Sequence, residues 1–221
     1  MKLGVLFSGG KDSVFAMYKA MQHDDVVCLI NVISENKESY MFHTPNIELT
    51  RVQAEAIGLP LIIELTKGQK EEELEDLRRA IQRAKREYKL DGIVTGALAS
   101  VYQASRIQKI CNDLELKCIN PLWQTNQIDH MRNVVDAGFE VMIVGVFARP
   151  LTHLLGKKIN KHVIDELADL ERKHKINPAG EGGEIETFVL DGPIFKKRIV
   201  ITDVEIGKEV YSIKDAKLVE K

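Results

Sequence analysis

Short apolar runs alternate with amphipathic stretches along the first half of the chain. Runs rich in β-branched residues and bounded by turn-forming residues are typical of buried parallel strands. Strands that alternate with helices indicate βαβ units, so the pattern predicts an α/β fold with a doubly wound parallel sheet. Ligands of such sheets bind beyond the carboxyl ends of the strands. The strands are expected at 3–7, 26–33, 59–65, 92–95 and 117–119.

The clearest helical segment spans residues 71–88. Acidic residues crowd its start and basic residues its end, as the helix dipole favours. The charges therefore predict a solvated helix face and not a binding patch. One apolar stripe at helical spacing faces the core, and it comprises Leu74, Leu77, Ile81, Ala84 and Tyr88.

The rhythm changes near Trp123, where strict alternation of strand and helix is lost. We therefore predict two domains, a nucleotide-binding domain at 1–123 and a smaller α+β domain at 124–221. The second domain is expected to contain a helix at 128–137, an apolar run at 139–147, a helix at 163–173, a glycine-rich segment at 177–184 and two strands at 185–190 and 198–205.

Composition indicates a globular protein. The 221 residues are 44% hydrophobic and 29% charged, with a net charge of −2. The protein therefore has no overall positive potential that would attract nucleic acid. No apolar run approaches the ~20 residues of a membrane span, and the N-terminus lacks the pattern of a secretory signal. Three cysteines, Cys28, Cys111 and Cys118, contain no C-x-x-C pair. We expect a cytoplasmic protein without disulfides or a cysteine zinc site.

The first strand leads directly into a loop suited to binding phosphate. Its two glycines let the backbone approach a polyanion, its lysine supplies positive charge, and the following helix offers free N–H groups. Neither a Walker P-loop nor a G-x-G-x-x-G register fits the loop. The alternative is a polar surface turn. The loop comprises Ser8, Gly9, Gly10, Lys11, Asp12 and Ser13.

Two further segments offer candidate ligands. After the fourth strand, Gly96 permits a close approach, and hydrogen-bond donors follow it at Ser100, Tyr102, Gln103 and Arg106. These residues could equally form an ordinary helix N-terminus. The adenine of a nucleotide is expected at the end of the second strand, against Ile33, Ser34 and Met41.

An acidic segment lies around two glycines, Gly182 and Gly183. An i, i+2 spacing places Glu184 and Glu186 on one face of an extended chain, and Glu181 precedes them. Clustered carboxylates suit a cationic substrate, Mg²⁺, or a general base acting on ammonia. The alternative is a solvated acidic loop. The six histidines, which include His130, show no metal-ligand spacing and are interpreted as core or surface residues, so no metal ligands are assigned.

Four motifs together resemble the diphthine–ammonia ligases, a family of PP-loop ATP pyrophosphatases. The resemblance extends from Leu3 to about Asp191 and rests on S-G-G-x-D-S, T-G-A-L-A-S-x-Y-Q-x-x-R, P-L-W and N-P-A-G-E-G-G-E-x-E-T-F-V-L-D. It implies cleavage of ATP to AMP and pyrophosphate, with Mg²⁺. It also implies amidation of diphthine on translation elongation factor two by free ammonia, through an acyl-adenylate.

The resemblance also implies residue roles. Lys11, Glu184 and Glu186 would be catalytic, and the loop at 8–13, Ile33, Ser34, Met41 and Gly96 would bind ATP. A trimethylammonium group on diphthine would lie against the acidic pair or an aromatic face such as Trp123 or Tyr102. The residues implied in substrate binding are Ser100, Tyr102, Gln103, Arg106, Trp123, Glu181, Gly182, Gly183, Glu184 and Glu186.

Two other functions stay open from the residues. A PP-loop enzyme modifying tRNA would need a basic RNA surface, and a thiolase would also need paired catalytic cysteines. A non-catalytic nucleotide-binding module would fail to hydrolyse ATP or to exchange pyrophosphate. The sequence leaves homo-oligomer formation undetermined, and it predicts no membrane or nucleic-acid partner.

Overall fold

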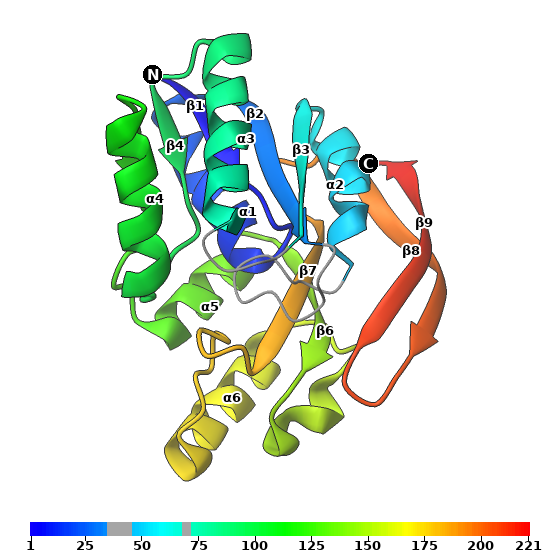
Figure 1. The fold of residues 1–221 in the computed structure, drawn as a ribbon. Helices are drawn as coiled ribbons and strands as arrows, with labels where there is room; N and C mark the ends of the chain where they lie inside the picture. The colour runs from blue at the N-terminus through cyan, green and yellow to red at the C-terminus, as the bar shows by residue number, and fades with distance from the viewer. Residues whose placement is uncertain (35–45, 68–71) are drawn as a thin grey trace.

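The structure is a computed structural model that describes residues 1–34, 46–67 and 72–221 (Figure 1). Met41, expected at the adenine, lies outside the described residues. The fold is built around a five-stranded parallel sheet in the order β3-β2-β1-β4-β5. The strands are β1 (Lys2–Leu6), β2 (Asp25–Ser34), β3 (Leu61–Thr66), β4 (Gly92–Val94) and β5 (Lys117–Ile119).

The strand order confirms the predicted doubly wound α/β fold. From β1 the chain proceeds outward through β2 and β3, then returns to β4 on the other side of β1. The loops after β1 and β4 therefore part from each other at the carboxyl edge of the sheet. This switch point is where such sheets bind ligands.

Helices cover both faces of the sheet (Figure 1). Neighbouring residues of β2 contribute to different apolar clusters, Leu29 to the cluster containing α1 and α2 and Ile30 to the one containing α3 and α4. This alternation follows the two-residue period of a strand. The helices are α1 (Lys11–Ala20), α2 (Thr50–Ile57), α3 (Glu72–Tyr88) and α4 (Val101–Asp113).

Helix α3 corresponds to the predicted segment 71–88, and Leu77, Ile81 and Ala84 of its apolar stripe are buried. The prediction of a solvated charged face is wrong at one position. Glu73 is only 3% exposed. It lies one helical turn before the buried Leu77 and therefore on the same side of α3, which faces the protein.

The second half of the chain forms two antiparallel pairs and two helices. Strand β6 (Glu140–Val146) pairs with β7 (Ile185–Asp191), and β8 (Lys197–Ile206) forms a long hairpin with β9 (Tyr211–Glu220). The sequence did not predict β9. A bulge at Asp203 interrupts the pairing of this hairpin, and most of its side chains are half-exposed or exposed, so no apolar run marks the strand. The helices are α5 (Gln127–Asp136) and α6 (Lys161–His174).

One apolar core joins the two halves. It contains Val5 of β1, Phe15 of α1, Phe188 of β7 and Ile213 of β9, all buried. Figure 1 shows β7 reaching the start of α1. The boundary at 123/124 stays a prediction, and the structure packs the halves without an intervening gap in this core.

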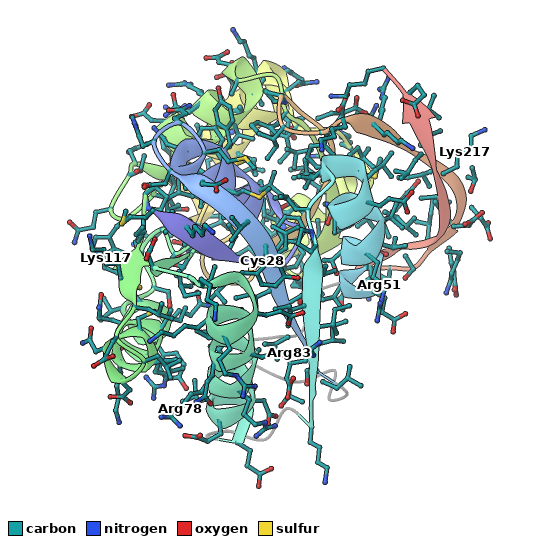
Figure 2. The ribbon with its side chains drawn as sticks, turned by 90° about the horizontal axis from the view of Figure 1, so that it is seen from above. Cys28, Arg51, Arg78, Arg83, Lys117 and Lys217 are labelled. Atoms are coloured by element: carbon teal, nitrogen blue, oxygen red, sulfur yellow. The ribbon has the colours of Figure 1, made fainter. Side chains whose placement is uncertain are left out.

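Basic side chains are dispersed over the surface. The basic residues labelled in Figure 2 come from four elements, Arg51 from α2, Arg78 and Arg83 from α3, Lys117 from β5 and Lys217 from β9, whereas Cys28 is buried. These labelled residues therefore do not belong to one element. Within the described part of the chain, no helix has the length and apolar character that crossing a membrane requires.

Candidate active site

A cavity of about 270 Å³ lies at the carboxyl edge of the sheet, at the switch point between β1 and β4. Segments far apart in the sequence enclose it, with the β1–α1 loop on one side and the glycine-rich segment before β7 on the other. Its lining comprises residues 6–8, 10–13, 30–32, 95–97, 179–181 and 185–187, together with Ile47, Leu77, Gln103 and Ile107.

The β1–α1 loop turns sharply into the helix. Gly9 has φ +79°, and an added Cβ would lie 2.1 Å from Oε1 of Gln53. Helix α1 begins without a side-chain cap. The backbone N–H groups of Asp12 and Ser13, two residues that line the cavity, have no hydrogen-bond acceptor among the described residues. Free N–H groups at a helix N-terminus suit an anion.

Lys11 is 2% exposed, and its ammonium group is held from two sides. Nζ donates to Oδ2 of Asp12 at 2.9 Å and to the carbonyl oxygen of Ala179 at 2.5 Å, while its backbone N–H donates to Oγ1 of Thr187 at 3.1 Å. These contacts fasten the loop to the second half of the chain. They also hold the charge of Lys11 at the wall of the cavity.

Asp12 has a second partner that the sequence did not reveal. His130 of α5 is fully buried, its Nε2 lies 2.6 Å from Oδ1 of Asp12, and its ring packs edge-on against Phe15. Burial alone would raise the pKa of Asp12, but Lys11 and then His130 outweigh it and lower the pKa to about 2. Asp12 is therefore a permanent anion at neutral pH.

No local motif marks His130. It is one of six histidines without metal-ligand spacing, and it reaches Asp12 across 118 positions of sequence. Nδ1 of His130 is buried and has no hydrogen-bond partner among the described residues. The only signal in the sequence is its position on an amphipathic helix, which core histidines share.

Glu186 lines the cavity, and its carboxylate makes no hydrogen bond or ion pair with another described residue. Burial raises its pKa to about 7, Lys11 opposes the rise, and the negative charge of Asp12 adds to it. Glu181 also lines the cavity and accepts a hydrogen bond from the backbone N–H of Ala99 at 3.2 Å. Burial, and then Asp12, raise the pKa of Glu181.

Glu184 lies in different surroundings from Glu186. Its Oε1 accepts from the backbone N–H of Asn177 at 3.0 Å and from Nδ2 of Asn177 at 2.7 Å, and its Oε2 accepts from the backbone N–H of Gly182 at 2.9 Å. Glu184 precedes the first residue of β7 and is not part of the cavity lining. It therefore closes the glycine turn that carries Glu181 and the exposed Gly183.

The residues after β4 divide between the cavity and the surrounding structure. Gln103 and Gly96 line the cavity. A Cβ on Gly96 would lie 2.7 Å from the backbone nitrogen of Ser13, so this glycine lets the loop approach α1. Ser100 caps α4 by accepting from the backbone N–H of Gln103 at 3.4 Å. The guanidinium of Arg106 lies 3.5 Å from the centroid of the Tyr102 ring.

At the second strand, Asn31 and Val32 line the cavity, whereas Ile33 and Ser34 lie beyond its described lining. Asn31 donates from Nδ2 to Oγ1 of Thr50 at 2.6 Å. Trp123 is half-buried and outside that lining as well. Among the residues that the structure describes, no group of three or more His, Cys, Asp or Glu side chains could hold a metal ion.

Two family models match almost the entire chain. The Diphthamide synthase N-terminal domain matches residues 1–118, and the Diphthamide synthase C-terminal domain matches residues 126–219. The diphthine–ammonia ligase of Schizosaccharomyces pombe is 37% identical over 224 residues, which cover 93% of this chain and 37% of that protein. The human diphthine–ammonia ligase is 33% identical over 232 residues, which cover 93% of this chain and 85% of that protein.

The chain thus spans just over a third of the fission-yeast relative and most of the human one. Among solved structures, a predicted subunit of tRNA methyltransferase from Methanocaldococcus jannaschii aligns with a TM-score of 0.47 and 16% sequence identity. That alignment covers 87% of this chain and 98% of the other. A likeness this distant carries no argument about function.

Proposed function

This chain belongs to the diphthamide synthase family, and from that premise we propose that it is a diphthine–ammonia ligase that uses ATP to convert the carboxylate of diphthine to an amide. One observation supports the assignment above the others. One cavity combines an anion-binding side, formed by Lys11 and two N–H groups at the start of α1, with the carboxylate of Glu186, and neither these two N–H groups nor this carboxylate has a partner among the described residues.

The chemistry requires both sides. A carboxylate has no good leaving group for displacement by ammonia. Its oxygen attacks the α-phosphorus of ATP, the bond between the α-phosphorus and the bridging oxygen breaks, and pyrophosphate leaves. Ammonia then forms the C–N bond, the C–O bond to AMP breaks, and the added nitrogen loses its proton. Lys11 and the free N–H groups of Asp12 and Ser13 stabilise the charge on the departing pyrophosphate.

The triphosphate is expected over the β1–α1 loop, because the unbonded amides of Asp12 and Ser13 lie there. Mg²⁺ would neutralise charge on the phosphates. Since the described residues contain no preformed metal cluster, we expect the ion to be held largely by the phosphates. The adenine is proposed at the end of β2, near Ile33 and Ser34, with residues 1–123 as the ATP-binding half.

The protein substrate is proposed to enter over the glycine-rich turn and residues 124–221. Glu184 would act by holding that turn in place, and Glu186 by facing the substrate in the cavity. We propose translation elongation factor two as the substrate, free ammonia as the nitrogen donor and the cytoplasm as the compartment. Two residues expected in substrate binding, Tyr102 and Arg106, lie against each other outside the described lining.

The test combines product identity with a loop variant. Elongation factor two carrying diphthine is incubated with the protein, ATP and an ammonium salt, and mass spectrometry detects the amide while chromatography separates nucleotides. AMP and pyrophosphate are expected. Lys11→Ala is expected to weaken ATP binding roughly 30- to 150-fold, because a hydrogen bond to a charged group contributes about 2–3 kcal/mol.

Lys19→Ala is the matched control, since Lys19 is an exposed lysine of the same helix. It should retain wild-type ATP binding. Formation of ADP and phosphate, or an unchanged ATP affinity in Lys11→Ala with native circular dichroism, would contradict the proposed function.

A further inference from the structure

An exposed aromatic ring lies beside the cavity and has no role in the chemistry described so far. Phe147 follows the last residue of β6 and is 46% exposed, although the six residues before it are buried. Its backbone N–H donates to the carbonyl oxygen of Glu184 at 2.9 Å. The position of Phe147 is therefore fixed to the same turn that leads into β7.

Gly145 brings the ring next to Glu186. Gly145 and Glu186 are paired residues of β6 and β7, so a side chain at either position points to the same face. A Cβ on Gly145 would lie 3.0 Å from Cβ of Glu186, and 3.0 and 3.1 Å from two carbons of the Phe147 ring. The ring thus occupies the space over Gly145, beside the stem of Glu186.

Among the residues that the structure describes, none donates a hydrogen bond to the carboxylate of Glu186 or forms an ion pair with it. Lys11, whose positive charge acts on Glu186, already donates to Asp12 and to the carbonyl oxygen of Ala179. A half-buried carboxylate without hydrogen bonds is costly unless a cation joins it. The arrangement of an aromatic face and a single carboxylate suits a cation that has no N–H group, because such a cation needs no set of acceptors.

We propose that Phe147 and Glu186 form the receptor for the quaternary ammonium group of the substrate side chain. This inference rests on the proposed function, since diphthine carries a trimethylammonium group on the carbon bonded to its carboxyl carbon. If Glu186 holds the trimethylammonium group, the carboxylate of diphthine lies in the same cavity as Lys11. The α-phosphorus of ATP is expected in that cavity too. An ammonium ion or Mg²⁺ would instead require several oxygen ligands.

The aromatic faces expected from the sequence are less suited to this role. The Tyr102 ring is already covered by the guanidinium of Arg106, 3.5 Å from its centroid. Trp123 lies in the segment between β5 and α5, whereas Phe147 directly follows β6, the strand that pairs with β7 and Glu186. Phe147 combines exposure with a ring that lies over Gly145, beside the stem of Glu186. No motif in the sequence pointed to it, because its neighbour Glu186 comes from β7, far away in the chain.

Steady-state amidation of diphthine-bearing elongation factor two tests the receptor. Phe147→Leu keeps an apolar side chain but removes the ring, and it is expected to raise KM for the protein substrate roughly 3- to 30-fold while KM for ATP changes less than twofold. Phe147→Tyr keeps the ring and should restore KM. Val101→Ala, which truncates another exposed apolar side chain, is the matched control.

A probe without the protein substrate separates this inference from the proposed function. Tetramethylammonium is titrated into wild type and Phe147→Leu by NMR, with sodium as the control ion. Saturable binding to wild type that weakens at least threefold in Phe147→Leu supports the receptor, even if no amidation is detected. Equal tetramethylammonium affinity in the two proteins, or a wild-type KM for the protein substrate in Phe147→Leu, would overturn it.

Discussion

Two glutamates two residues apart show how strongly surroundings determine chemical character. Glu184 accepts three N–H groups and holds a turn together, whereas the carboxylate of Glu186 meets no donor among the described residues. The i, i+2 spacing suggested equivalent roles. Local backbone donors capture the first carboxylate, and the second is left with a raised pKa in the cavity.

The pKa of about 7 at Glu186 predicts a pH-dependent stability. The unfolded chain loses this proton near pH 4.5, the folded protein only near pH 7, so stability falls as pH rises through that window. Glu186→Gln removes the loss. The difference in the free energy of unfolding between Glu186→Gln and wild type should therefore shift in favour of the variant by up to about 3 kcal/mol from pH 4.5 to pH 8. Lys11, Asp12 and Glu181 face the same cavity and remain unchanged.

Urea unfolding at the two pH values measures this difference. Glu184→Gln is the control, because Glu184 accepts hydrogen bonds and its replacement should destabilise the protein by about 1–3 kcal/mol at both pH values. A difference between Glu186→Gln and wild type that stays constant from pH 4.5 to pH 8 would show that Glu186 does not titrate in this window.

Among the elements, α1 depends on contacts from three others for its position. Strand β7 supplies Thr187 to the N–H of Lys11, α5 supplies His130 to Asp12, and the loop after β4 passes so close that Gly96 has room only for a hydrogen. The geometry of the β1–α1 loop therefore belongs to the assembled fold. The loop sequence provides the groups, and the neighbours hold them.

Gly96→Ala tests the close approach to α1. The φ of Gly96 lies outside the left-handed region, so the cost of alanine is steric alone, from a Cβ 2.7 Å from the backbone nitrogen of Ser13. We expect a loss of about 1–3 kcal/mol of stability, as overpacking causes, together with weaker ATP binding. Thermal unfolding and nucleotide titration measure the two effects.

The matched control is Gly207→Ala in the β8–β9 turn, where the nearest atom to a Cβ is 3.3 Å away. It should change stability by no more than about 0.5 kcal/mol. Equal effects of the two substitutions on both stability and ATP binding would mean that the contact between Gly96 and α1 does not position the loop.

For the whole molecule, the shared core predicts one cooperative unfolding transition. Phe15 of the first half and Phe188 of the second belong to one buried cluster, although one family model ends at residue 118 and the other begins at residue 126. Unfolding either half would expose the apolar surface of the other. Far-UV circular dichroism and the fluorescence of Trp123, the single tryptophan, should give the same urea midpoint. Two separated midpoints would contradict this prediction.

The sequence by itself determined the layered α/β fold and the glycine turn that leads from β1 into α1. Both follow from short-range patterns, because β-branched runs specify buried strands and the glycines before Lys11 specify a strand-to-helix turn. The same patterns placed Glu186 in a candidate site. They missed β9, whose half-exposed side chains leave no apolar run.

Only the tertiary structure decided which side chains meet in the cavity. His130 reaches Asp12 from α5, Phe147 lies beside Glu186 across the β6–β7 pair, and Glu184 turns back to Asn177. The first two contacts join residues far apart in the chain, and the third depends on free N–H groups that a turn exposes once it has formed. A pattern of residue types does not predict these contacts. The register of β6 against β7 brings Phe147 beside Glu186, and the packing of α5 on α1 brings His130 to Asp12.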